Sequence, residues 1–230
     1  MKKKILIIAA HPDDEVLGCG GTIAKHTLNK DLVEVMILGE GITSRSKIRN
    51  TNFDKKKLLR LKEITLKANR TLGVKNVIFG DLPDNRFDEL NILDVIKRIE
   101  EVIFKFKPNI IYTHSGLDLN RDHKITNEAV LTASRPQQNY FLKKLIFFEI
   151  PSSSEWSSTE KKQFSPNYYN NISNQFKKKM KAIQFYKSEI RKWPHPRSLK
   201  GIEYLARLRG GQVGCEYAES FYIAREINFE

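Results

Sequence analysis

Continuous apolar runs, rather than alternating ones, characterise the first half of the chain. Ile5 to Ala10 is a run of six apolar residues, four of them large and aliphatic, which is typical of a strand buried on both faces of a parallel sheet. A glycine-containing stretch, a segment of helical pattern at 22–28 and a second apolar run at 32–38 follow. This order predicts a βαβ unit whose first strand lies at the centre of the sheet.

The same alternation continues through the next hundred residues. Apolar periodicity predicts helices over 54–72, 90–106 and 122–134, the last ending before Pro136, and strands at 77–79, 110–113 and 144–150. Five strands alternating with helices favour an α/β fold of doubly wound type. We expect a Rossmann-like three-layer α/β/α sandwich with a mostly parallel central sheet.

The chain changes character after Pro151. Ser, Asn, Gln and Lys dominate as far as about Gln175, which indicates a polar loop or lid over 151–175. Helical patterns at 176–191 and 199–209 and a short apolar run at 220–224 complete the sequence. We find no segment with the character of a linker, so we expect a single domain over 1–230, with 176–230 packing on it as a C-terminal helical extension.

Composition narrows the class of protein. The 230 residues are 40% hydrophobic and 29% charged, which suits a folded globular chain and excludes a disordered or disulfide-stapled one. Two cysteines fit a reducing compartment, so we expect the cytoplasm, although two thiols suffice for one bridge. The apolar run after the N-terminal lysines is too short for a signal peptide, and no stretch approaches the roughly 20 residues of a transmembrane helix.

The formal net charge of +13 favours anionic partners. A nucleic-acid or anionic-surface binding module is therefore one hypothesis, and the lysine clusters 55–57 and 177–179 are its motivation. No RNA-recognition block or paired-cysteine finger accompanies these lysines. They lie in predicted helices, where solvated faces are the ordinary explanation, so we expect no nucleic-acid partner.

Two polar clusters follow predicted strands that can be neighbours. His11-Pro12-Asp13-Asp14-Glu15 comes after the first strand, and residues 113–123, which include His114 and His123, come after the strand at 110–113. Ligands of open α/β sheets bind beyond the carboxyl ends of the strands. Two imidazoles and a carboxylate there can hold a divalent metal and leave a position for water. The alternative is an acidic turn that merely caps the next helix.

The residues from Ala10 to Gly21, Ala-His-Pro-Asp-Asp-Glu-Val-Leu-Gly-Cys-Gly-Gly, closely resemble the first signature of the PIG-L/LmbE-like deacetylase family. Stretches 82–86, 118–136 and 210–219 agree with further blocks. Members of this family typically hydrolyse the N-acetyl group of N-acetylglucosamine-containing molecules with zinc. The resemblance implies that this chain does so too, with an N-acetylated amino sugar or its conjugate as the small-molecule substrate.

Carried over by position, the resemblance implies that His11, Asp14 and His123 bind zinc and that Asp13 is the general base. The chemistry agrees, because zinc lowers the pKa of water to about 7 and polarises the amide carbonyl. A carboxylate beside the metal can then take the proton of the attacking water. Two histidines and a carboxylate also suit Fe²⁺, so iron remains an alternative metal in the cell.

The sequence departs from the family at Asn120, where many members have a histidine three residues before the last metal ligand. Asparagine can donate a hydrogen bond to an oxyanion but cannot deliver a proton. Either Asp13 returns its proton or a histidine supplies one, and we favour His114 over His195 because it lies at the expected strand end. Asp122, next to His123, is the expected partner that orients an imidazole.

Polar residues near the expected site are candidates for contact with the substrate. Candidates on predicted loops near the site are Arg45, Asp84, Arg86 and His195, and for each arginine a solvated or paired surface position is the competing interpretation. The segment 193–198 is either a lid or a surface turn. A metal-dependent amidase or deacylase that acts on another glycan-pathway conjugate would use the same catalytic residues. The oligomeric state is not indicated by the sequence.

Overall fold

The computed structural model describes residues 2–45, 51–137, 141–157 and 163–228, the side chains of 45 and 51–54 excepted. Its helices and strands, in chain order, are β1 (Lys4–Ala9), α1 (Asp14–Leu28), β2 (Leu32–Gly39), the 3₁₀ turn η1 (Thr43–Arg45), α2 (Thr51–Leu72), β3 (Asn76–Leu82), the 3₁₀ turn η2 (Phe87–Glu89), α3 (Ile92–Phe106), β4 (Ile110–His114), α4 (Arg121–Ala133), β5 (Lys144–Phe148), β6 (Tyr168–Asn171), α5 (Phe176–Ile183), α6 (Leu199–Gly211) and β7 (Ala218–Glu226).

One mixed sheet organises the described residues, with strand order β3-β2-β1-β4-β5-β7-β6. The first five strands in this order are parallel, and β7 pairs antiparallel with both β5 and β6. The expected α/β fold, the mostly parallel sheet and the central place of the first strand are confirmed. The chain runs outward from β1 in both directions, which creates a switch point between β1 and β4.

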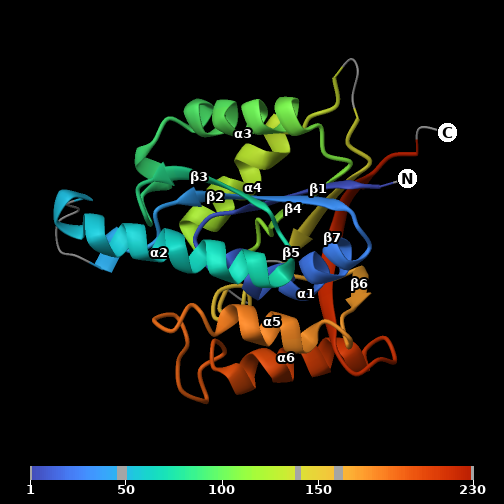
Figure 1. The fold of residues 1–230 in the computed structure, drawn as a ribbon. Coiled ribbons are helices and arrows are strands. Elements are labelled where there is room, and N and C mark those ends of the chain that lie inside the picture. Colours follow the sequence, from blue (N-terminus) through green and yellow to red (C-terminus); the bar gives the residue numbers. More distant parts are fainter. Residues whose placement is uncertain (1, 46–50, 138–140, 158–162, 229–230) are drawn as a thin grey trace.

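Helices cover both faces of this sheet (Figure 1). Alternate residues of the central strands point to opposite sides, so Ile5 and Ile7 pack toward α1 and α2 while Leu6 and Ile8 pack toward α3 and α4. Both faces are apolar, which explains the continuous rather than alternating hydrophobic runs. Helix α5 packs on α1 and α2, so the C-terminal segment adds a further layer on that side.

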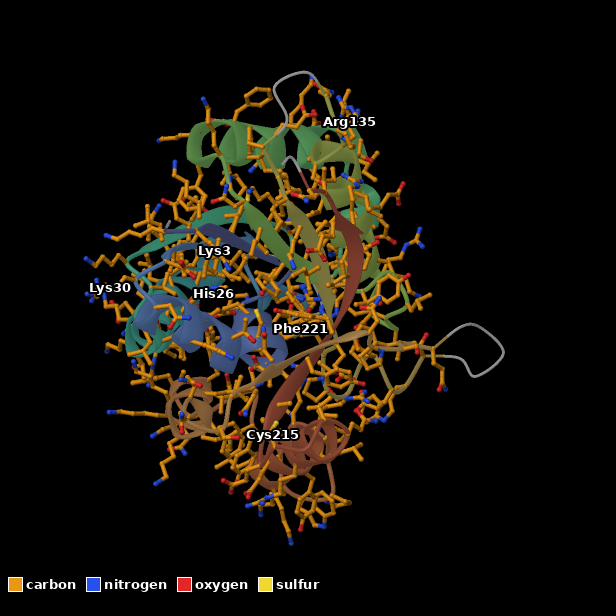
Figure 2. All side chains as sticks on the ribbon, turned by 90° about the vertical axis from the view of Figure 1, so that its right-hand side faces the viewer. Lys3, His26, Lys30, Arg135, Cys215 and Phe221 are labelled. Carbon is orange, nitrogen blue, oxygen red and sulfur yellow. The ribbon has the colours of Figure 1, made fainter. Side chains whose placement is uncertain are left out.

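The C-terminal third differs from its sequence-based prediction in three places. Four residues of the segment 151–175, expected to be loop or lid, form β6 at the sheet edge. The helix expected over 176–191 ends at Ile183, because the chain then turns so that Tyr186 points into the core. The apolar run at 220–224 is the middle of the nine-residue β7, which Figure 2 shows running past Phe221 toward Cys215.

Helix α1, which follows the first polar cluster, is kinked at Cys19, where φ is −147° and ψ is 24°. The kink frees two backbone N–H groups, and both are bound by one buried carboxylate: Gly21 N and Thr22 N donate to Glu219 of β7 at 2.8 and 2.7 Å. Lys179 of α5 completes the arrangement, because its Nζ lies 2.6 Å from Glu219 Oε1 and also donates to the carbonyl of Leu17. The helix is thus held by the last strand.

Replacing Lys179 by Met is expected to lower the free energy of unfolding by about 3–5 kcal/mol, because it leaves the Glu219 carboxylate buried without its cation. Urea denaturation followed by circular dichroism measures this change. Lys178→Met, one residue away and exposed, is the matched control and should change the free energy of unfolding by no more than about 0.5 kcal/mol. Equal stability of the two variants would contradict the role given to the ion pair.

Candidate metal and catalytic site

The turn after β1 sends neighbouring side chains in different directions. Asp13 has a φ of 107°, a conformation that residues other than glycine rarely adopt. Its carbonyl accepts hydrogen bonds from Val16 N and Leu17 N, which begins α1, and its own N–H donates to Glu15 Oε2 at 3.0 Å. Asp14 turns back instead, so that its Oδ2 accepts from His11 N at 2.9 Å. Two consecutive aspartates thereby take different positions.

Because β1 and β4 are adjacent, the loops beyond their ends meet. There the structure brings His11, Asp14 and His123 together, with one potential ligand atom from each within 4.8 Å of the others. His11 Nδ1 lies 3.4 Å and His123 Nε2 lies 3.2 Å from Asp14 Oδ2. The three residues that the sequence singles out as a metal site thus converge, from the β1–α1 turn and the first turn of α4.

A carboxylate stands behind each imidazole of this cluster. Asp122 Oδ2 lies 3.0 Å from His11 Nε2, so the aspartate next to His123 supports the other histidine. Asp118 Oδ1 lies 3.1 Å from His123 Nδ1. Carboxylates in these positions fix the ring orientation and tautomer of metal-binding histidines. Each outer nitrogen therefore faces a carboxylate, and Nδ1 of His11 and Nε2 of His123 face Asp14.

Two observations show that the cluster suits a cation. The buried atoms Asp14 Oδ1 and His123 Nε2 have no hydrogen-bond partner among the described residues. Burial opposes positive charge on both imidazoles, but the carboxylates around them outweigh this effect. Asp122 and Asp14 raise the pKa of His11 to about 10. Asp14 and Asp118 raise the pKa of His123 to about 9. The buried carboxylates are stabilised by positive charge at this site, and a divalent cation can provide that charge in place of the protons on the imidazoles. Two nitrogen donors and one carboxylate also match hydrolytic zinc sites.

Asp13, the expected base, is buried and borders this cluster. Burial, with the neighbouring Asp14, raises its pKa well above the usual value, whereas Arg197 acts in the opposite direction. Arg197 Nη1 lies 3.2 Å from Asp13 Oδ2, and its Nε donates to Ser152 Oγ at 2.8 Å. The guanidinium therefore ties the base to two segments of the C-terminal part. The sequence places Arg197 only in the segment 193–198, because no pattern in it connects this residue with a carboxylate 184 residues away.

His114, expected to be the proton donor, is not suited to that task. It is fully buried, and its Nε2 accepts the N–H of Ala10 at 2.9 Å. Its ring stacks on His123 with 4.0 Å between centroids. Burial and the charge of His123 lower its pKa well below 6.5, so the ring is neutral and Nε2 carries no proton. The geometry gives it a role in holding the β1–α1 turn and His123 in place.

Asn120, expected to contact the oxyanion, caps α4. Its Oδ1 accepts from Asp122 N at 2.8 Å and from His123 N at 3.4 Å, and its Nδ2 donates to Asn85 Oδ1 at 3.1 Å. An asparagine at this position satisfies the free N–H groups of the first helical turn. Asn120 therefore sets the direction of the turn that carries both Asp122 and His123.

The candidate substrate residues separate into different environments. Arg86 pairs with Glu89 at the surface, 3.0 Å apart. Asp84 is buried; it accepts from Ser44 N and Oγ, and its Oδ1 lies 3.4 Å from His11 Nε2, so it belongs with the groups behind the metal cluster. The side chain of Arg45 lies outside the described residues.

His195 is half-buried, and its Nδ1 accepts the N–H of Arg197. Burial and the nearby guanidinium of Arg197 lower its pKa below 6.5, so it is a poor source of a proton at neutral pH.

Two further residue types from the sequence lie away from the catalytic roles. Cys19 and Cys215 are free thiols and form no disulfide bond. His26, at the opposite end of α1, binds Asp31 and Tyr112.

Comparison of the sequence with known proteins finds one matching family and relatives that have deacetylase names. Residues 6–134 match the PIG-L family, described as GlcNAc-PI de-N-acetylase. An uncharacterised deacetylase of Escherichia coli K12 is 25% identical over 193 residues, covering 81% of this chain and 92% of the relative. A diacetylchitobiose deacetylase of Thermococcus kodakarensis is 29% identical over 198 residues, covering 82% of this chain and 70% of the relative.

Among solved structures, a 4-carboxy-2-hydroxymuconate hydratase from Pseudomonas putida superposes with a TM-score of 0.76 over 100% of this chain and 99% of its own, at 23% identity. The similarity establishes the fold, and the different reaction of that protein shows that the fold alone does not fix the activity. Within the described ranges, no helix has both the length and the apolar run needed to cross a bilayer.

Proposed function

The chain belongs to the PIG-L family, and from this we propose that it is a metal-dependent deacetylase that hydrolyses the N-acetyl group of an N-acetylglucosamine-containing or related amino-sugar substrate. The observation that carries the proposal is the convergence of His11, Asp14 and His123 next to the buried carboxylate of Asp13. Curated relatives with deacetylase names, spanning four-fifths of this chain, support the reaction class.

Each residue of the site has a separate role in this proposal. His11 Nδ1, Asp14 and His123 Nε2 would hold the metal, with Zn²⁺ favoured because amide hydrolysis needs no redox step and Fe²⁺ as the alternative. A bound divalent cation polarises the amide carbonyl and makes water a nucleophile near neutral pH. Asp13 accepts the proton of that water.

Asp13 also returns the proton to the departing amine in this proposal. His114 is buried and carries no proton at Nε2, and the amide of Asn120 cannot act as an acid, so neither replaces it. Arg197 lies against one oxygen of the Asp13 carboxylate and directs the other oxygen, which takes and gives back the proton. The acetyl group leaves as acetate and the sugar as a free amine.

Two finer points belong to the same proposal. The free thiols of Cys19 and Cys215 accord with a reducing compartment, and we place the enzyme in the cytoplasm. The alternative substrate, another acylated conjugate of a glycan pathway, would be hydrolysed by the same residues. The two substrate classes differ only in the protein residues that contact the part of the substrate beyond the amide.

The test combines metal analysis with product detection. Purified protein is expected to contain about one divalent metal per chain and to release acetate and free amine in equal amounts from N-acetylglucosamine or N,N′-diacetylchitobiose. Chelation should abolish the release, and Zn²⁺ or Fe²⁺ should restore it. Metal without acetate release would direct the search to other acyl groups, and neither metal nor release after adding both cations would refute the proposed function.

A further inference from the structure

The chain has two tryptophans, Trp156 and Trp193, and both are about half exposed, at 51% and 52%. A single exposed apolar side chain needs no special explanation. The surroundings of these two differ, however. Trp156 lies among residues that contact the candidate site, whereas Trp193 packs edge-to-face on Tyr204 of α6, with the ring centroids 5.2 Å apart.

The segment that carries Trp156 is fastened to the metal cluster. Ser153 and Ser154 donate their hydroxyl groups to Asp118, the carboxylate behind His123. The carbonyl of Ser153 also accepts the N–H of Leu119, which is 52% exposed. Trp156 therefore lies two residues after a serine that holds the β4–α4 loop.

A second segment meets Trp156 from the other side. The rings of Trp156 and His195 contact edge-to-face, with centroids 5.4 Å apart and planes at 81°. His195 is fixed by the N–H of Arg197, whose guanidinium binds Asp13. The same guanidinium donates to Ser152 and so joins the two segments directly. The aromatic pair is thus anchored to the metal cluster through Asp118 and to the base through Arg197.

We propose that Trp156, backed by His195, is the platform on which the pyranose ring of the substrate stacks while its acetamido group reaches Asp13. The inference rests on the proposed function and adds a residue that recognises the sugar. One face of a pyranose consists of C–H groups and suits an aromatic ring, which offers a large rigid surface at low entropic cost. The ring contact with His195 and the hydrogen bonds of Ser153 and Ser154 to Asp118 pre-organise the indole before the sugar arrives.

Fluorescence of single-tryptophan variants tests the platform without depending on turnover. Trp193→Phe leaves Trp156 as the reporter, and Trp156→Phe leaves Trp193, an equally exposed control. Both are titrated with glucosamine, the product expected from N-acetylglucosamine, and with N-butylacetamide, which has the amide but no sugar ring. We expect a saturable change in emission with glucosamine in Trp193→Phe and none in Trp156→Phe. A change in both variants, or an equal response to N-butylacetamide, would overturn the platform.

Kinetics provide a second, separate readout. Trp156→Ala is expected to raise KM for acetate release from N-acetylglucosamine about tenfold with little change in kcat, and Trp156→Phe to restore most of the loss. Unchanged KM in Trp156→Ala, with acetate still released, would refute the platform and leave the deacetylase intact. A saturable Trp156 signal without acetate release would instead support the platform and count against the proposed reaction.

Discussion

Asp13→Asn is expected to reduce kcat for acetate release by about 10²–10⁴-fold, the contribution of a well-placed general base, while the metal content stays that of the wild type. Asparagine is the informative replacement because it tolerates the positive φ of this position and can still accept the hydrogen bond from Arg197. It cannot take a proton from water. Steady-state kinetics and elemental analysis on the same sample measure the two quantities.

The control for this variant is Asp88→Asn, which removes an exposed carboxylate from the turn η2 and should leave kcat and metal content unchanged. If Asp13→Asn loses metal in parallel with activity, Asp13 is a ligand rather than the base. If it retains full activity, the proton is taken by another group and the division of roles between Asp13 and Asp14 is wrong.

His123→Ala is expected to remove both metal and activity. The variant lacks the Nε2 atom that faces Asp14, and losing even an outer partner of a metal ligand typically weakens affinity by about 10–100-fold, so the loss of a ligand should exceed that. Metal content after dialysis is the primary measurement, and acetate release should fall to the background of the assay. His11 and Asp14 alone would hold the cation too weakly to survive dialysis.

His26→Ala is a matched control, since it deletes an imidazole that binds Asp31 and Tyr112 at the far end of α1. Its metal content should equal that of the wild type. Thermal unfolding of both variants separates loss of metal from loss of fold. A His123→Ala protein that keeps its metal and folds normally would refute the proposed ligand set.

The sequence predicts the five parallel strands of this protein well, because the pattern that identifies each strand lies within the strand itself. Residues 5–10 are apolar on both faces, so their run identifies a central strand, and the polar residues after it must then lie at the edge where ligands bind. His11, Asp14 and His123 come from two such loops, next to adjacent strands. The adjacency of β1 and β4 brings the two loops together, whereas the choice of these three residues as ligands comes from the resemblance to the family.

The residues that the sequence did not predict act through long-range contacts. Arg197 reaches Asp13, and Ser153 and Ser154 bind Asp118, each across a separation that no periodicity encodes. The sequence pattern does not indicate strand β6, because its residues, Tyr168–Asn171, form no apolar run. The sequence predicts the position of His114 at a strand end, but its burial against Ala10 and His123 depends on tertiary packing.

The kink in α1 has a consequence for the time at which this protein becomes able to fold. The N–H groups of Gly21 and Thr22 obtain their acceptor from Glu219, about 198 residues farther along the chain. During synthesis the turn that carries His11, Asp13 and Asp14 therefore emerges long before the strand that stabilises its helix, although domains generally fold as units. A nascent chain that ends before β7 lacks this acceptor, so the helix that begins at Asp14 obtains its full set of hydrogen bonds only after translation of nearly the whole chain.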